Sequence, residues 1–260
     1  MIDTGGHGPT VILLHALPFN ATMWAPQLEG LKGSARVIAV DLKGFGESDA
    51  PSDITSCTME AYADEVKQVI DQLRLHRVIV VGLALGGWVA LTLYRRHPEV
   101  VTAMVLADTR PDAESSDGQV RRLEQQRLAA KSGVRAVAGS WHELLTSESS
   151  RRAQPELAAA LLDLMDDRIE GFVGALEAVK NRPDMTNALR DISVPTLIIV
   201  GESDQISPPA LSRQMHELIA GSKLSILPGV GTMTNLEAPS VFNRLVTQFT
   251  SAQTVGLLPN

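Results

Sequence analysis

Residues Val78–Leu93 read V-I-V-V-G-L-A-L-G-G-W-V-A-L-T-L, and this stretch decides the fold. It begins as an apolar, β-branched run typical of a strand that is buried on both faces, and it continues as a helical segment. Gly82 and Gly86 bound a sharp turn, where the missing side chains allow the strand and helix backbones to approach closely. Ala84 stands at the centre of this turn. The position that the turn presents most prominently therefore carries only a methyl group.

The composition is that of an acidic globular protein. Apolar residues make up 44% of the 260 residues and charged residues 20%, which excludes a disordered chain and allows one α/β domain with an insertion. The net charge of −7 disfavours nucleic acid and an anionic membrane surface as main partners. We expect a monomer or a homodimer, and we expect its ligand to be a small molecule.

Cysteine usage and the first residues predict where the protein works. Cys57 is the single cysteine, so an intrachain disulfide cannot form. The opening residues, M-I-D-T-G-G-H-G-P-T, lack the basic and apolar regions of a signal peptide, and we therefore expect a cytoplasmic location. The histidines lack metal-ligand spacing, so the sequence implies no metal, and we expect no cofactor.

Short apolar runs alternate with amphipathic stretches along the chain. The predicted strands are Val11–His15, Val37–Asp41, Val78–Gly82, Val101–Ala107, Thr196–Gly201 and Lys223–Leu227. The predicted helices between them are Thr58–Leu75 with Thr58 as its N-cap, Leu85–His97, Pro208–Ile219 and Pro239–Thr250. This alternation predicts an α/β fold with a doubly wound, mostly parallel sheet.

Residues 114–191 interrupt this alternation. They contain no convincing strand and predict helices over Gln119–Lys131, Val134–Leu145, Pro155–Asp166 and Ile169–Lys180. A helical insertion between two late strands is typical of a lid over the carboxyl edge of the sheet. We therefore predict a core formed by residues 1–113 and 192–260, and a helical cap formed by residues 114–191.

Basic residues cluster on the first two helices of this predicted cap. They are Arg121, Arg122, Arg127, Lys131 and Arg135. A solvated helix face explains them best, and a patch that steers carboxylates towards a site is the alternative interpretation.

Four sequence blocks in register resemble α/β-hydrolases of the bacterial esterase and 3-oxoadipate enol-lactonase type over nearly the whole chain. Leu13–Pro18 (L-L-H-A-L-P) resembles the family's oxyanion loop, and Asp41–Ser48 (D-L-K-G-F-G-E-S) resembles its D-x-R-G-x-G-x-S block. Gly82–Gly86 corresponds to the G-x-S-x-G nucleophile elbow. Gly201–Asp204 and Gly229–Met233 stand where the family places its acid and its histidine.

Two positions depart from the family pattern. Ala84 replaces the nucleophilic serine and Thr232 replaces the histidine, while Asp204 keeps the place of the acid. In a complete triad the histidine takes the proton of the serine, and the acid orients the histidine. The resemblance thus implies a degenerate triad that cannot perform Ser–His ester hydrolysis. Asp204 is then either a carboxylate hydrogen-bonded to Thr232 and turn amides, or a general base with a raised pKa. We expect Asp204 to reach the space next to Ala84 directly, with the Thr232 hydroxyl as its nearest side-chain donor.

The resemblance also implies which groups bind the ligand. The backbone N–H groups of Leu17 and Leu85 would form the oxyanion hole, because backbone donors survive side-chain substitution. Trp24, Trp141 and His142 are the candidate substrate-binding residues. Trp24 could pack in the core or form a wall of the pocket, and Trp88 on the elbow helix is expected to pack in the core. His142 could be an exposed cap residue or a replacement base. His15 in the oxyanion loop is expected to be structural, and Asp108 is expected to pair with Arg110.

Three explanations of the missing residues remain open at this stage. In the first, the chain is an inactivated form of an ester or lactone hydrolase. In the second, it is a cofactor-independent lyase, decarboxylase or cyclase, in which Asp204 is the general base and the oxyanion hole holds an enolate. In the third, it is a non-catalytic sensor of a small molecule. All three predict a largely apolar pocket that binds a small carbonyl or ester-like compound, and the fold alone does not separate them.

Overall fold

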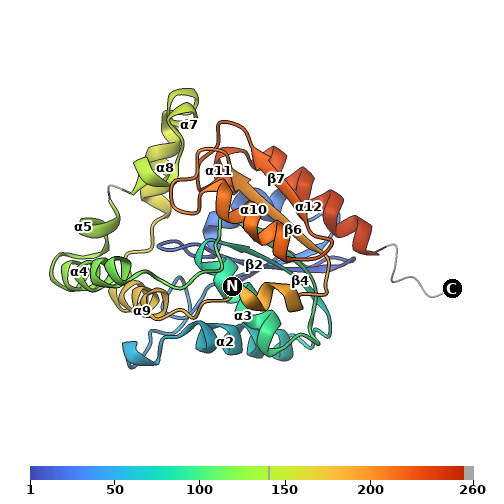
Figure 1. Ribbon diagram of the computed structural model, residues 1–260, viewed down its shortest axis with the longest axis horizontal. Helices are drawn as coiled ribbons and strands as arrows, with labels where there is room; N and C mark the ends of the chain where they lie inside the picture. The colour runs from blue at the N-terminus through green and yellow to red at the C-terminus, as the bar shows by residue number, and fades with distance from the viewer. Residues whose placement is uncertain (140, 255–260) are drawn as a thin grey trace.

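The computed structural model describes residues 1–139 and 141–254, and it is organised around one sheet (Figure 1). The sheet has the order β1-β3-β2-β4-β5-β6-β7, in which β1 pairs with β3 antiparallel and the other neighbours are parallel. The strands are β1 (Ile2–Asp3), β2 (Thr10–Leu14), β3 (Arg36–Val40), β4 (Val78–Leu83), β5 (Val101–Ala107), β6 (Thr196–Gly201) and β7 (Lys223–Leu227). The predicted α/β fold with a mostly parallel sheet is confirmed.

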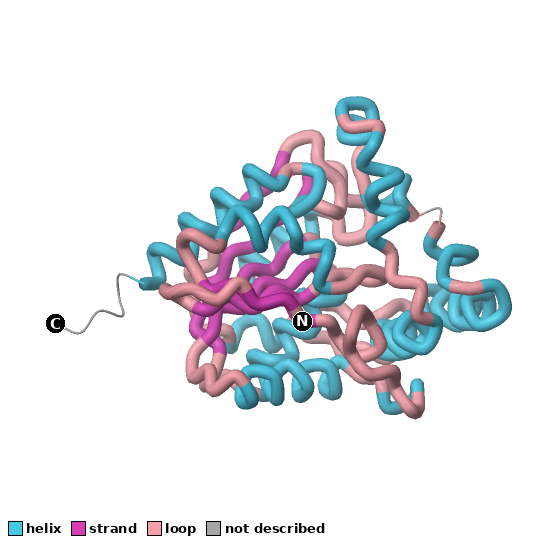
Figure 2. Tube along the Cα trace, turned by 180° about the vertical axis from the view of Figure 1, so that it is seen from behind, coloured by secondary structure: helices cyan, strands magenta, loops and turns pink. Residues whose placement is uncertain are grey.

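Helices cover both faces of this sheet, as the tube in Figure 2 shows. The helices of the core are α1 (Ala25–Leu31), α2 (Met59–Gln72), α3 (Leu85–Arg96), α10 (Pro209–Leu218), α11 (Thr234–Glu237) and α12 (Pro239–Thr254). Alternate residues of β4 belong to two separate hydrophobic clusters. Val81 packs with residues of α1 and α12, whereas Val80 packs with residues of α2, α3 and α10. This two-sided burial explains why the strands read as continuous apolar runs.

The segment between β5 and β6 is helical. It contains α4 (Ser116–Ser132), α5 (Val134–Ala138), α6 (His142–Leu145), α7 (Glu148–Ala153), α8 (Glu156–Leu164) and α9 (Ile169–Lys180). These helices gather beside one end of the sheet (Figure 1). We call residues 114–191 the helical insertion.

The sequence predicted most elements to within a few residues, and β5, β6, β7 and α9 have the predicted bounds. Thr58 caps α2 as predicted, because its hydroxyl accepts from the N–H of Ala61. The single helix predicted over Val134–Leu145 is wrong: α5 and α6 are separate. The two-residue strand β1 was not predicted, because two residues are too short to show a period.

The strand order places a ligand site at one edge of the sheet. From β2 the chain moves to β3 on one side and then returns to β4 on the other, so the order reverses between β2 and β4. In open α/β sheets, ligands bind outside the carboxyl ends of the strands at such a reversal. Leu17 follows β2 and Ala84 follows β4 at this point. No helix within the described residues is long and apolar enough to cross a membrane.

Candidate active site

The turn between β4 and α3 is a strained elbow with Ala84 at its tip. Ala84 has φ 49° and ψ −108°, a left-handed conformation that costs energy for any residue with a side chain. Its N–H donates to Ala107 O at 3.0 Å, and its carbonyl accepts from the Thr109 hydroxyl at 2.9 Å and from the N–H groups of Gly87 and Trp88. A Cβ on Gly82 would lie 2.2 Å from Gly86 O, so this turn requires glycine at its base.

Leu17 and Leu85 each carry a backbone N–H group without a partner among the described residues. Both residues line the cavity described below. Leu85 is the first residue of the 12-residue helix α3, whose N-terminal dipole favours negative charge. The arrangement can accept a carbonyl oxygen or an oxyanion.

Asp204, in the loop after β6, and Thr232, in the loop after β7, lie within hydrogen-bond distance of each other. Oδ1 of Asp204 accepts from the Thr232 hydroxyl at 2.6 Å and from the N–H groups of Ile206 and Ser207 at 2.8 and 2.9 Å. The prediction that Thr232 donates to Asp204 is therefore confirmed. Oδ2 is buried and has no hydrogen-bond partner among the described residues.

The burial of Asp204 has two consequences for its chemistry. Desolvation raises the pKa of Asp204, against the opposing effect of its three hydrogen bonds. Thr232 lines the cavity, but Asp204 does not. The expectation that Asp204 reaches the ligand space directly is thus wrong, because the threonine side chain stands at the cavity wall in front of the buried carboxylate.

A second buried carboxylate lies nearby. Asp108 follows β5 with φ 46° and is fully buried; it accepts from the N–H of Gly201 and from the hydroxyl of Thr234. Desolvation, together with the neighbouring charge of Asp204, raises its pKa well above the usual range. The sequence suggested an ion pair of Asp108 with Arg110. This pair does not form, since Arg110 pairs with Asp112.

His15 is a structural residue, as the sequence indicated. It is fully buried, and its Nε2 accepts from the N–H of Leu42 while its Nδ1 donates to Ala16 O. Burial lowers its pKa to about 4, so the ring is neutral at physiological pH. It holds the oxyanion loop against the chain that follows β3.

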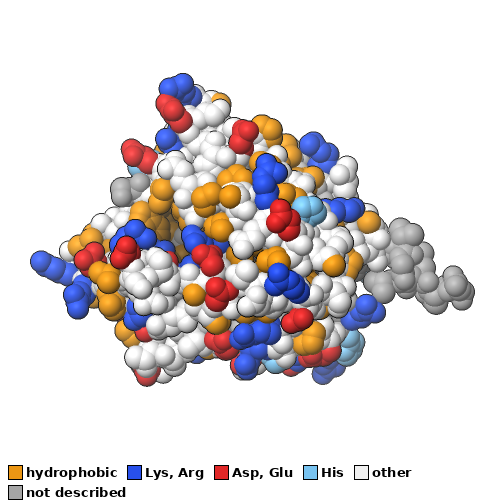
Figure 3. Space-filling model, in the orientation of Figure 1, with side chains coloured by type: hydrophobic (Ala, Val, Ile, Leu, Met, Phe, Trp, Pro, Cys, Tyr) orange, Lys and Arg blue, Asp and Glu red, His pale blue; other side chains and the backbone are white. Residues whose placement is uncertain are grey.

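A cavity of about 470 Å³ lies over the elbow. Its floor contains Leu17, Ala84, Leu85 and Thr232, and its roof comes from Trp141 and Leu144 of the helical insertion. The volume is that of a site for a small organic molecule. Figure 3 shows a hollow in which hydrophobic and basic side chains meet beside this insertion.

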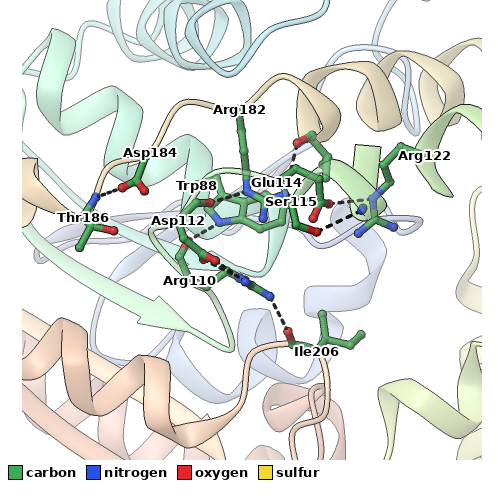
Figure 4. A network of polar contacts seen from close by, with 12 residues as sticks. Trp88, Arg110, Asp112, Glu114, Ser115, Arg122, Arg182, Asp184, Thr186 and Ile206 are labelled. Carbon is green, nitrogen blue, oxygen red and sulfur yellow. Dashed lines mark hydrogen bonds and ion pairs between the residues drawn. The ribbon is translucent and has the colours of Figure 1, made fainter. Parts of the chain in front are cut away.

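The lining of the cavity is mainly apolar, as expected, but one wall is rich in arginine. Arg110, Arg121, Arg122 and Arg182 all line it, together with Glu114. Figure 4 shows how the network is connected: Arg122 and Arg182 converge on Glu114, and Arg110 pairs with Asp112.

Trp88 belongs to the same wall and was wrongly assigned to the core. It stands one turn into α3 and lines the cavity, with the guanidinium of Arg182 4.1 Å from the centre of its ring. Its indole N–H donates to Arg110 O. Its place in the first turn of the elbow helix is a sequence signal that could have identified it. Arg182, beyond the end of α9, gave no comparable signal.

Of the three residues predicted to bind substrate, only Trp141 lines the cavity. Trp24 is fully buried and packs against Phe242, with ring centres 6.0 Å apart, so its core interpretation is correct. His142 does not line the cavity, and its Nδ1 lies 3.2 Å from Gly139 O. Trp141, the N-cap of α6, lines the cavity, whereas His142, the first residue of that helix, does not.

Comparison with known proteins places these features in a family. The model of the alpha/beta hydrolase fold family matches residues 9–239. A thermophilic esterase from Thermogutta terrifontis, solved with malate bound, is 30% identical with a TM-score of 0.92, over 97% of this chain and 93% of that one. The enol-lactonase from Burkholderia xenovorans LB400 is 27% identical with a TM-score of 0.86, over 95% and 92%. A putative 2-succinyl-6-hydroxy-2,4-cyclohexadiene-1-carboxylate synthase from Bacillus subtilis (strain 168) is 26% identical over 247 residues, which are 92% of this chain and 89% of that protein.

Proposed function

Because the chain belongs to the α/β-hydrolase fold family, we propose that it binds a small carbonyl compound of the ester or lactone type without forming a covalent acyl-enzyme. One observation carries the proposal. The elbow presents the Ala84 methyl group to the cavity, next to two unpartnered N–H groups. A methyl group cannot attack a carbonyl, whereas the two donors can still hold its oxygen.

The ligand would lie with its carbonyl oxygen between the N–H groups of Leu17 and Leu85. The dipole of α3 adds to the attraction for this oxygen. Thr232 would contact the other side of the carbonyl group. Its hydroxyl donates to Asp204 Oδ1 at 2.6 Å, and that oxygen also accepts from the N–H groups of Ile206 and Ser207.

The test combines a covalent probe with a binding measurement. A fluorophosphonate should give no adduct by intact-protein mass spectrometry, and p-nitrophenyl butyrate should give no burst of product. The same ester should quench tryptophan fluorescence saturably, because Trp88 and Trp141 line the cavity. An Ala84→Leu variant fills the floor of the cavity and should lose this quenching. An adduct on Ser48, Ser203 or Thr232, or quenching that Ala84→Leu leaves unchanged, would contradict the proposal.

A second candidate is the cofactor-independent lyase, and the bridging position of Thr232 favours it. The threonine hydroxyl could take a proton from a carbon next to the bound carbonyl while passing its own proton to Asp204 Oδ1. The electron pair of the broken C–H bond would move to the carbonyl oxygen, where the two N–H groups stabilise the enolate. The raised pKa of Asp204 suits it as the final acceptor.

Deuterium exchange separates this candidate from pure binding. In D₂O a lyase would introduce deuterium next to the carbonyl of a bound ketone, and both Thr232→Val and Asp204→Asn would abolish the exchange. A sensor would bind the ketone saturably and exchange nothing. Exchange that persists in both variants would exclude the relay through Thr232.

A further inference from the structure

The arginine wall of the cavity carries more positive charge than its paired carboxylates neutralise. Four guanidinium groups, those of Arg110, Arg121, Arg122 and Arg182, line the cavity. The carboxylates paired with them are Asp112 and Glu114. The wall therefore holds two positive charges more than negative ones, in a protein whose net charge is −7.

Arg182 is fixed rigidly within this wall. Its side chain is only 3% exposed, and it donates through Nε to Asp112 O and through Nη1 to Glu114 and Val179 O. Its guanidinium also lies over Trp88. A cation held in this way has already lost its rotamer freedom, so it can bind a ligand at little entropic cost.

Several donors of the wall have no protein acceptor. Nη2 of Arg182 and Nη2 of Arg122 donate to nothing within residues 1–139 and 141–254, and the same holds for the whole guanidinium of Arg121. By contrast, Arg110 uses all three of its nitrogens on Asp112 and Ile206 O. The free donors come from α4 and from the chain after α9, and they line one cavity.

We propose that this wall is an anion subsite, and that the ligand is a carbonyl compound carrying a carboxylate, which Arg121, Arg122 and Arg182 bind. The inference rests on the proposed function, since it assigns a binding site to the other end of the same ligand. Planar guanidinium groups with free N–H donors match the geometry of a carboxylate, and such charge-assisted bonds are stronger than neutral ones. The carbonyl lies at the elbow and the carboxylate lies at the wall.

A matched pair of probes tests the subsite. 4-Oxo-4-phenylbutanoate carries a ketone and a carboxylate, and 4-oxo-4-phenylbutanamide has nearly the same shape without the charge. Calorimetric titration of the unmodified protein should give a Kd about tenfold lower for the acid than for the amide. The double variant Arg121→Gln/Arg122→Gln should bring the two Kd values together and leave that of the amide unchanged.

The control variant removes the same charge from the same helix. Arg127 and Lys131 are exposed residues of α4 that do not line the cavity, so Arg127→Gln/Lys131→Gln should keep the tenfold preference. Circular dichroism confirms that both double variants are folded. Equal binding of acid and amide by the unmodified protein would overturn the anion subsite and leave the proposed function standing. Equal losses in both double variants would also overturn it, since they would indicate general electrostatic attraction. Failure of both probes to bind at millimolar concentration would contradict the proposed function as well.

Discussion

The elbow and the loop that carries Thr232 line the same cavity, yet they differ in what they preserve. At the elbow, backbone packing sets the geometry: Gly82 and Gly86 allow the close approach, and Leu85, which lines the cavity, keeps its backbone N–H whatever side chain stands at position 84. In the loop, the side chain at position 232 is itself the group that lines the cavity and contacts Asp204. A substitution there changes the chemistry and leaves the backbone in place.

This difference teaches that the backbone of a site and its reacting side chains are specified separately. A Cβ on Gly201 would lie 1.9 Å from Gly231 O, so the loop is also held by close backbone contact. Asp204 keeps the position of the acid, with one oxygen satisfied and one unpartnered. Under the proposed function, the frame for a triad is therefore kept, while its two reacting side chains are replaced.

The largest effect is expected from breaking the backbone of the elbow. A Cβ on Gly86 would lie 2.1 Å from Leu14 O, a backbone atom that cannot yield without moving β2. We expect Gly86→Ala to lower the free energy of unfolding by about 3 kcal/mol or more, measured by urea denaturation. Gly33→Ala is the matched control, since Gly33 is exposed with nothing within 4 Å of an added Cβ. It should change stability by no more than about 0.5 kcal/mol.

The next largest effect should come from restoring the side chains. If the frame is intact, Ala84→Ser combined with Thr232→His should produce esterase activity on p-nitrophenyl butyrate. Each single reversion should remain several orders of magnitude below the pair, because the groups act as a unit. Asp204→Asn in the double revertant should remove the activity again. A folded double revertant with no activity would mean that the loop has diverged in geometry as well as in chemistry.

A smaller effect concerns the buried carboxylate of Asp108. Its pKa is raised in the folded protein, so the folded state keeps the proton to a higher pH than the unfolded chain. Its contribution to stability is complete below the unfolded pKa, near 3.8, and is lost as the pH rises through the folded pKa. Asn can keep both hydrogen bonds without the charge. We therefore expect Asp108→Asn to become progressively more stable relative to the unmodified protein across this pH range, by an amount on the order of 1 kcal/mol.

Denaturation series at several pH values check this prediction. Asp112→Asn provides the contrast, because Arg110 holds the pKa of that carboxyl below its usual value. The difference in stability between Asp112→Asn and the unmodified protein should change with pH in the opposite direction. The reason is that the unmodified protein loses the contribution of Asp112 as the pH falls. A pH-independent difference for Asp108→Asn would mean that this carboxyl titrates normally in the folded state.

The sequence predicted the fold because burial on both faces leaves a strong signal. The bounds of β5, β6 and β7 followed from continuous apolar runs, and the elbow followed from the spacing of Gly82 and Gly86. The pairing of Asp204 with Thr232 was also predictable, since each sits in a recognisable block. These features depend on residues close together in the sequence or on a pattern shared with a family.

The wall of the cavity could not be predicted in the same way. The wall is built from four separate segments, and only the packing of the helical insertion on the sheet brings them together. Its residues are Trp88, Arg110, Arg122 and Arg182. On α4, Arg122 has the same local pattern as the exposed Arg127. Which of them faces a cavity depends on the direction of the helix axis, and charge patterning alone does not give this direction.

The smallest effect is expected for His142, the candidate base on the helical insertion. It is half-buried at the start of α6, but it does not line the cavity, and its Nδ1 contacts Gly139 O. His142→Ala should leave the Kd of 4-oxo-4-phenylbutanoate and any deuterium exchange within about twofold of the unmodified protein. Its neighbour Trp141 provides the contrast, because it lines the cavity and packs against Phe172 with ring centres 5.8 Å apart. Trp141→Ala should weaken binding about tenfold through lost apolar contact. If His142→Ala instead abolishes exchange that Asp204→Asn leaves intact, the base comes from the insertion, and the side of the cavity that holds Asp204 and Thr232 has only a structural role.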